Sequence, residues 1–152
     1  MKNFIKFTAV LFAAITLSAL MAHLLELRVK IDLSKADYQT VQGIYSGWQW
    51  LGIFEIGTIA LTIIWMILER KAKKRYQLLL SALFCFIVSI AIFFIFTFPT
   101  NEATGSWTAL PTNWNDLRQT WEYSHAARAC LSLVGFSLLV GTLLKKDMTF
   151  KE

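Results

Sequence analysis

Four long runs of apolar residues alternate with short polar segments along the chain. The runs cover residues 4–27, 48–68, 78–98 and 126–144. Each is close to the roughly 20 helical residues that cross a hydrocarbon core. The connection between the second and third runs is short, so these two helices should pair as an antiparallel hairpin. The pattern predicts an all-α protein, a four-helix transmembrane bundle that forms one domain over residues 1–152.

The two outer connections are longer, and their capping signals predict that they extend the helices. Ser34 and Asp37 have the spacing of a capping box, with Asp in place of the usual Glu or Gln. Asn113 follows a proline-containing turn and is itself followed by an acidic residue three positions on, a second helix start. We therefore expect helical extensions over residues 35–47 and 114–125, the second continuous with the last span.

Small residues recur at helical spacing within the apolar runs and predict close approach of helix backbones. They form three stripes: Ala14, Ser18, Ala22 and Glu26; Ser81, Cys85 and Ser89; and Ala127, Cys130, Ser137 and Gly141. The two cysteines fall at different depths, so we expect free thiols rather than a disulfide.

The charges are few and unevenly placed. Hydrophobic residues make up 56% of the chain and charged residues 16%, with a net charge of +5. Basic residues gather before the first run, between the second and third, and after the fourth: Lys2 and Lys6; Arg70, Lys71, Lys73, Lys74 and Arg75; Lys145, Lys146 and Lys151. All three blocks fall on one side, so the positive-inside rule predicts cytoplasmic N- and C-termini. The basic excess then reports topology in a bacterial inner membrane and contact with anionic lipid headgroups, not nucleic-acid binding.

The only two histidines stand in mirrored motifs at the outer ends of the first and last runs. His23 precedes Glu26 by three residues, and His125 follows Glu122 by three. This spacing places both side chains of a motif on one helix face. Because the two helices run antiparallel, like residues should lie at like heights and face one interior. Ionisable groups at membrane depth are costly and usually mark a functional site.

Two further ionisable side chains belong to the same depth, and the constellation has three interpretations. Glu55 and Arg128 should point into the interior that the histidines share. The first interpretation is a metal site for iron or another divalent metal, with the ligands His23, Glu26, Glu122 and His125. A haem held by the two histidines is a less favoured variant of it.

The second interpretation is a structural network, in which Arg128 and Arg118 pair with the buried carboxylates while the histidines form local hydrogen bonds. The third is a metal-free acid/base pocket, with a histidine as proton acceptor and Arg128 steadying an anionic intermediate. The residues alone leave the three open.

One run of the sequence resembles a known family. The pattern W-x-x-L-R-x-x-W-E-x-x-H-x-x-R extends from Trp114 to Arg128, after Asn101-Glu-Ala-Thr-Gly-Ser-Trp107. It is similar to the signature of the anthrone oxygenase-like family of small four-helix membrane proteins. The stretch from His23 to Trp48, with His-Leu-Leu-Glu-Leu and Val-Gln-Gly-Ile-Tyr-Ser-Gly-Trp, resembles its bacterial members.

The resemblance implies an activity, since fungal relatives are associated with oxidising anthrones to anthraquinones with dioxygen. It makes Arg118, Trp121, Glu122, His125 and Arg128 motif positions. With the polar constellation, this gives an expected catalytic set and an expected substrate-binding set. The catalytic set is His125, Arg128, Glu122 and Glu55, and the substrate-binding set is Trp107, Arg118 and Trp121.

The expected function is thus a small membrane oxidoreductase or oxygenase-like protein. Its substrate would be an apolar aromatic or quinone-like compound that arrives from the bilayer. Iron or another divalent metal is one expected cofactor, and dioxygen without a metal is the other. The alternative is a non-catalytic membrane module that binds a lipid or a partner subunit through its aromatic outer face.

Overall fold

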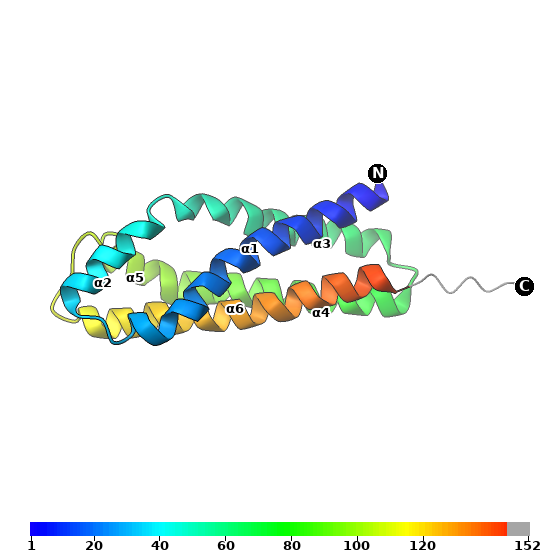
Figure 1. The fold of residues 1–152 in the computed structure, drawn as a ribbon. Helices are drawn as coiled ribbons and strands as arrows, with labels where there is room; N and C mark the ends of the chain where they lie inside the picture. The colour runs from blue at the N-terminus through cyan, green and yellow to red at the C-terminus, as the bar shows by residue number, and fades with distance from the viewer. Residues whose placement is uncertain (146–152) are drawn as a thin grey trace, which may run out of the picture.

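The computed structural model describes residues 1–145 of the chain, and these form helices and turns without a strand. The helical elements in chain order are α1 (Lys2–Lys30), α2 (Lys35–Gln42), two 3₁₀ helices (Gly43–Tyr45 and Trp48–Leu51), α3 (Gly52–Leu68), α4 (Lys73–Ile92), a π-helix (Phe93–Thr97), α5 (Phe98–Ala103) and α6 (Trp114–Leu144). The predicted all-α class is confirmed. Figure 1 shows the long helices side by side, with α2 and α5 at one end and the N-terminus at the other.

Within residues 1–145, four helical stretches are long and apolar enough to cross a membrane. They are Lys2–Lys30, Trp48–Leu68, Lys73–Ala103 and Trp114–Leu144. Their outer surfaces carry exposed apolar side chains at membrane depth, as expected of a bundle surrounded by lipid. The third stretch is longer than residues 78–98, because the π-helix and α5 continue it.

Pro99 does not end the third helix, because it lies in the first turn of α5. Proline has no backbone N–H and donates no hydrogen bond to the preceding turn, and its fixed φ is compatible with the start of a helical segment. The preceding π-helix, Phe93–Thr97, absorbs the change of register. Such π turns are rare and often accompany functional sites.

The helices do not pack through all of the predicted small residues. The buried positions of α1 are Ala9, Ala13, Thr16, Leu20, His23 and Lys30. On α6, the predicted stripe of Ala127, Cys130, Ser137 and Gly141 is exposed, and the buried small residues are Ser124, Ala129, Ser132 and Gly135. Membrane helices are apolar on every side, so hydrophobicity does not reveal which face meets the neighbouring helix. On α4 the prediction holds for Cys85 and Ser89 but not for Ser81, and both cysteines are free.

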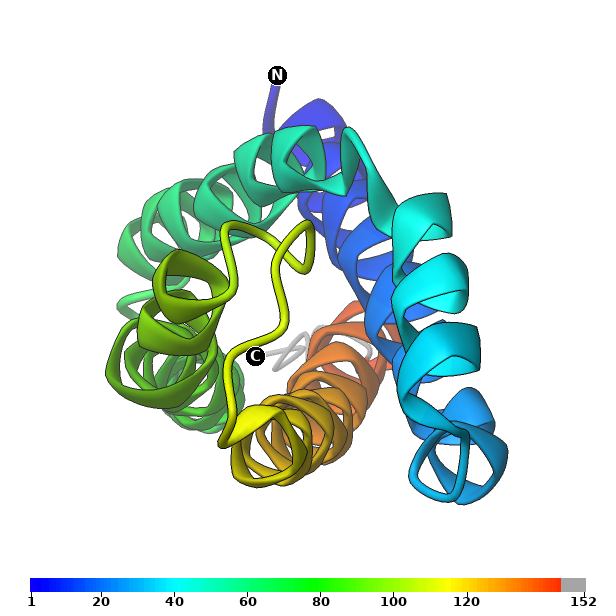
Figure 2. The ribbon, with the colours of Figure 1, turned by 90° about the vertical axis from the view of Figure 1, so that its left-hand side faces the viewer.

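The end of the bundle opposite the N-terminus is closed by α2 and by the loop that follows α5. Figure 2 looks onto this end and shows the loop lying over the middle of the ring of helices. Ser34 caps α2, since its hydroxyl accepts a hydrogen bond from the Asp37 N–H. Tyr38, Trp107 and Trp121 are the buried centre of an aromatic cluster at this end. A second buried hydrophobic cluster, which includes Trp65, Phe86 and Leu139, lies among α1, α3, α4 and α6.

Candidate functional site

The two histidines meet at the interface between α1 and α6. Their ring centroids lie 4.2 Å apart with an angle of 31° between the ring planes. His23 is 5% exposed and His125 is 8% exposed. The predicted convergence of the mirrored motifs is therefore present. Nδ1 of both rings is buried and has no hydrogen-bond partner among the described residues.

Aromatic rings from three segments surround this imidazole pair. The Trp121 centroid lies 4.3 Å from that of His125 and 5.0 Å from that of His23. Tyr45 and Trp48, from the 3₁₀ helices that lead into α3, lie 4.5 Å and 5.5 Å from the His23 ring. Two imidazolium ions at this separation would repel each other, so one uncharged ring is available as a proton acceptor.

Lys30 lies beside the same aromatic rings, and its ammonium contacts two carboxylates, a phenol and two rings. Its Nζ forms an ion pair of 2.9 Å with Oε1 of Glu122, and both residues are buried. It lies 3.8 Å from Oε2 of Glu26 and donates a hydrogen bond of 2.9 Å to the Tyr45 hydroxyl. Its ammonium also sits 4.5 Å from the Tyr45 ring centroid and 4.8 Å from that of Trp121.

Two tyrosine hydroxyl groups donate hydrogen bonds to the carboxylates around Lys30. The Tyr38 hydroxyl donates a hydrogen bond of 3.0 Å to Oε1 of Glu122, and the Tyr45 hydroxyl donates to Oε2 of Glu26. Burial, followed by the charge of Glu122, raises the pKa of the Tyr38 phenol. Burial and the hydrogen bond to Glu26 raise the pKa of Tyr45. Both phenols therefore keep their protons at physiological pH. Oε2 of Glu122 is buried and has no partner among residues 1–145.

Arg128 and Glu55 form a separate ion pair below the histidines. Nη2 of Arg128 lies 2.7 Å from Oε2 of Glu55, and the guanidinium packs 4.8 Å from the ring centroid of Phe93. Ser89 of α4 donates to Oε1 of Glu55 at 3.4 Å. Arg128 is buried and Glu55 is partly buried. This ion pair links α3 to α6 and holds both side chains in place.

The remaining predicted residues, Arg118 and Trp107, lie at the closed end of the bundle, which we call the cap of the site. Arg118 donates to the Leu33 carbonyl at 2.7 Å and packs 4.6 Å from the Trp114 ring. Among residues 1–145 it pairs with no carboxylate, so the predicted structural network is present for Arg128 with Glu55 but not for Arg118. Trp107 is 5% exposed and its ring lies 5.9 Å from that of Trp121.

The loop strains its backbone to place Trp107 in the cap. Ser106 and Trp107 have positive φ angles of 56° and 68°, which are uncommon for residues with a side chain. The Trp107 N–H donates to the Thr104 hydroxyl at 3.1 Å, which holds this turn in place. Trp121 in turn donates from Nε1 to Asn101 at 2.8 Å, so the cap is tied to α6.

The predicted metal ligands do not surround one point. Within the described part of the chain, no group of three or more His, Cys, Asp or Glu side chains could hold a metal ion. The physical reason is Lys30, whose ammonium takes the position between Glu26 and Glu122 that a divalent cation would need. The geometry therefore does not favour the ligand set His23, Glu26, Glu122 and His125. The direct contact of the two imidazoles also leaves no room for a haem plane between them.

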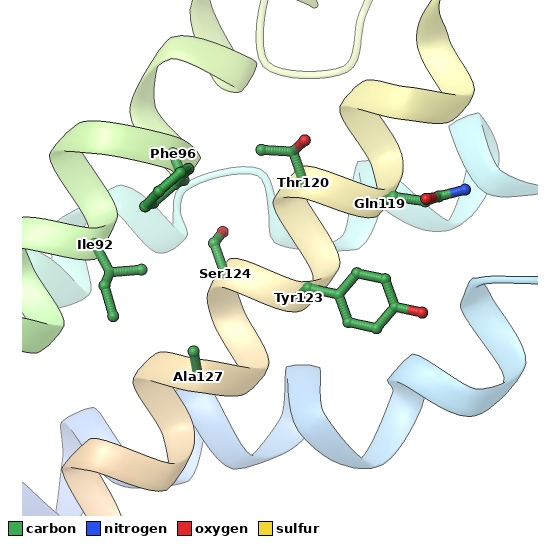
Figure 3. A pocket seen from close by; sticks show the side chains of 7 residues that line it. All are labelled: Ile92, Phe96, Gln119, Thr120, Tyr123, Ser124 and Ala127. Carbon is green, nitrogen blue, oxygen red and sulfur yellow. The ribbon is translucent and has the colours of Figure 1, made fainter.

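A surface groove of about 460 Å³ lies beside Ser124, between α6 and the end of α4. Figure 3 shows Ile92 and Phe96 on one side and Thr120, Ser124 and Ala127 of α6 on the other. Ser124 is the chain neighbour of His125 and shares a hydrogen bond of 2.8 Å with Thr97 of the π-helix. The groove is thus an apolar depression with a few hydroxyl groups, next to the turn of α6 that carries the histidine.

Sequence reasoning missed Lys30, Tyr38 and Tyr45. Lys30 lies three residues beyond the first apolar run, but it follows His23 by seven residues and continues the buried face of α1. That spacing was the available signal, since positions seven apart share a helix face. The two tyrosines lie where an interfacial aromatic belt is expected, and this hides their contribution to the site.

Comparison with known proteins identifies the family. The model of the anthrone oxygenase family matches residues 48–138, which include Glu55, Trp121, Glu122, His125 and Arg128. No curated protein and no solved structure matches the chain. The family match covers more than half of the sequence, and the described helices agree with the predicted four-span layout. This chain belongs to the anthrone oxygenase family.

Proposed function

We propose that this protein oxidises an apolar, anthrone-like or quinone-like aromatic compound with dioxygen, at the site built around His23 and His125. The observation that carries the proposal is a pair of buried imidazoles with unpaired Nδ1 atoms, set beside a buried ammonium. The ammonium of Lys30 and the imidazole of His23 flank the same two rings, Tyr45 and Trp121. A proton acceptor and a cation thus share one aromatic-walled interior.

This pairing matches the needs of the reaction. An anthrone carries a CH₂ group whose proton is acidic, because the resulting anion spreads onto the ring-bound oxygen. An uncharged imidazole accepts that proton, and the electron pair of the C–H bond stays on the substrate. The Lys30 ammonium then stabilises the negative charge that develops on the substrate oxygen.

Oxidation follows by reaction of the anion with dioxygen. A C–O bond forms, and the proton held by the imidazole returns to the distal oxygen to give a hydroperoxide. Loss of water breaks the O–O bond and removes the second hydrogen of the original CH₂ group, which leaves a carbonyl. One dioxygen is consumed and one water is released per quinone. The buried aromatic walls exclude bulk water from the anion, and we assign substrate entry to the groove beside Ser124, which lies next in the chain to His125.

The test is simultaneous measurement of oxygen uptake and quinone formation by the purified protein in lipid nanodiscs, with anthrone as substrate. Because the donor set does not favour a metal site, we expect the same rate after treatment with a chelator and after addition of iron. Protein-dependent uptake of one dioxygen per quinone supports the proposal. Absence of uptake above the rate of empty nanodiscs, with and without added iron, contradicts it and favours the non-catalytic binding module.

A further inference from the structure

The end of the bundle opposite the site carries a second cavity, of about 350 Å³. It lies where α1 begins, α3 ends and α4 begins, and Lys2, Lys6, Lys71 and Arg75 line it together with Glu69. The lining therefore carries a formal excess of three positive charges. At roughly 30 Å³ per water, its volume equals that of about ten water molecules. This is enough room for a small anionic group.

The cationic lining is partly fixed in place. Lys6 contacts Oε1 of Glu69 at 2.6 Å, and Arg75 contacts Oε2 of the same carboxylate at 2.8 Å. Glu69 is 8% exposed, so this pair of contacts orders both cations at the wall of the cavity. Lys2 and Lys71 are exposed and form no ion pair with any of residues 1–145, so their ammonium groups can turn toward a ligand.

The start of α4 adds to the positive potential. No side chain caps the N-terminus of this helix, and no acidic residue lies in its first turn. The backbone N–H groups there and the helix dipole favour an anion. The cavity thus combines four cationic side chains with an uncapped helix end.

The position of the cavity identifies the source of the anion. It lies at the ends of the membrane-spanning stretches, where lipid headgroups are found. Leu68 lines it and is 36% exposed, and the first turns of α1 expose Phe4 and Phe7 at 70% and 64%. An acyl chain can cover such apolar surface while a headgroup phosphate enters the cationic part. We propose that this cavity binds the phosphate of an anionic phospholipid.

The test compares two double variants with the same loss of charge. Lys2→Gln with Lys71→Gln removes two cavity cations, whereas Lys73→Gln with Lys74→Gln removes two neighbours that do not line the cavity. Calorimetric titration of the full chain in neutral detergent uses three probes: dioctanoyl phosphatidylglycerol, dioctanoyl phosphatidylcholine and inorganic phosphate. The thermal unfolding midpoint of each variant serves as the folding control.

We expect saturable binding of phosphatidylglycerol, at least about tenfold weaker binding of phosphatidylcholine, and little binding of free phosphate. The cavity variant should lose about tenfold or more in affinity for phosphatidylglycerol, and the neighbouring variant less than about twofold. Equal losses in both variants would mean diffuse surface attraction and would overturn the proposal. Binding of inorganic phosphate as tight as that of phosphatidylglycerol, or equal binding of the two lipids, would also overturn it.

Discussion

The ammonium of Lys30 lies 2.9 Å from Oε1 of Glu122, in an interior where both side chains are almost fully buried. Two charges in such a place are stable only as a pair, because each alone would lack compensation for its lost hydration. The Tyr38 hydroxyl donates to the same carboxylate oxygen at 3.0 Å. This pair joins α1 to α6 about one helical turn from His125 and fixes the cation that the proposed chemistry uses.

Breaking this pair should therefore cost more than removing it entirely. We expect Lys30→Met to reduce the free energy of unfolding by about 3–5 kcal/mol, because it leaves the buried Glu122 carboxylate uncompensated. The double variant Lys30→Met with Glu122→Leu should recover most of that loss. Reversible unfolding in detergent, followed by circular dichroism, measures both. Additive losses in the double variant would mean that the two side chains do not interact.

Two glycines of α6 should respond oppositely to the same substitution. A Cβ added at Gly135 would lie 2.6 Å from Cε1 of Phe86, whereas a Cβ at Gly141 meets nothing within 4 Å. Gly135→Ala should lower the free energy of unfolding by about 1–3 kcal/mol through overpacking. Gly141→Ala should raise it by about 0.5–1 kcal/mol, because glycine is a poor helix former. The same unfolding assay checks both, and a similar effect at the two sites would contradict the described packing of α4 on α6.

The Glu69 carboxyl, at the end of the bundle opposite the histidines, should make the thermal stability of the protein depend on pH. Burial raises its pKa, but the hydrogen bonds and charges of Lys6 and Arg75 outweigh burial and hold the pKa below its ordinary value of 4.5. A lowered folded-state pKa stabilises the fold above pH 4.5, and the gain is lost as pH falls below that value. The thermal midpoint of the wild type should therefore exceed that of Glu69→Gln at pH 7, and the gap should narrow below pH 4.5. A gap that is constant with pH would show that the carboxylate charge plays no part.

The fold could be predicted from the sequence to a greater extent than the site. Apolar run length specified the four long helices, and the capping signal at Asn113 gave the start of α6 within one residue. The mirrored motifs placed His23 and His125 together, because antiparallel helices bring equal depths into contact. The sequence could not show that Lys30 occupies the space between the carboxylates, since a long side chain at a helix end can turn to water as easily as inward.

The membrane orientation remains a prediction from charge asymmetry. Basic residues near Lys73 should lie in the cytoplasm and the cap near Asn113 outside. In a chain whose Cys85 and Cys130 are replaced by serine, an impermeant thiol reagent added to intact cells should label Asn113→Cys but not Lys73→Cys. Detergent lysis should make the second position reactive and serves as the control. The reverse pattern in intact cells would contradict the predicted topology.

The central claim is that the imidazole pair performs the proton transfer in an oxidation by dioxygen. We expect His125→Ala to reduce oxygen uptake with anthrone by about 10²-fold or more, because the proton acceptor is lost. Ser137→Ala, an exposed position on the same helix, serves as the matched control and should keep the wild-type rate. The circular dichroism spectrum and unfolding midpoint establish that both variants are folded. The most direct measurement is thus the oxygen-electrode rate of wild type, His125→Ala and Ser137→Ala in the same lipid. Loss of uptake in the histidine variant alone is the predicted result, and an unchanged rate in a folded His125→Ala protein would contradict the account.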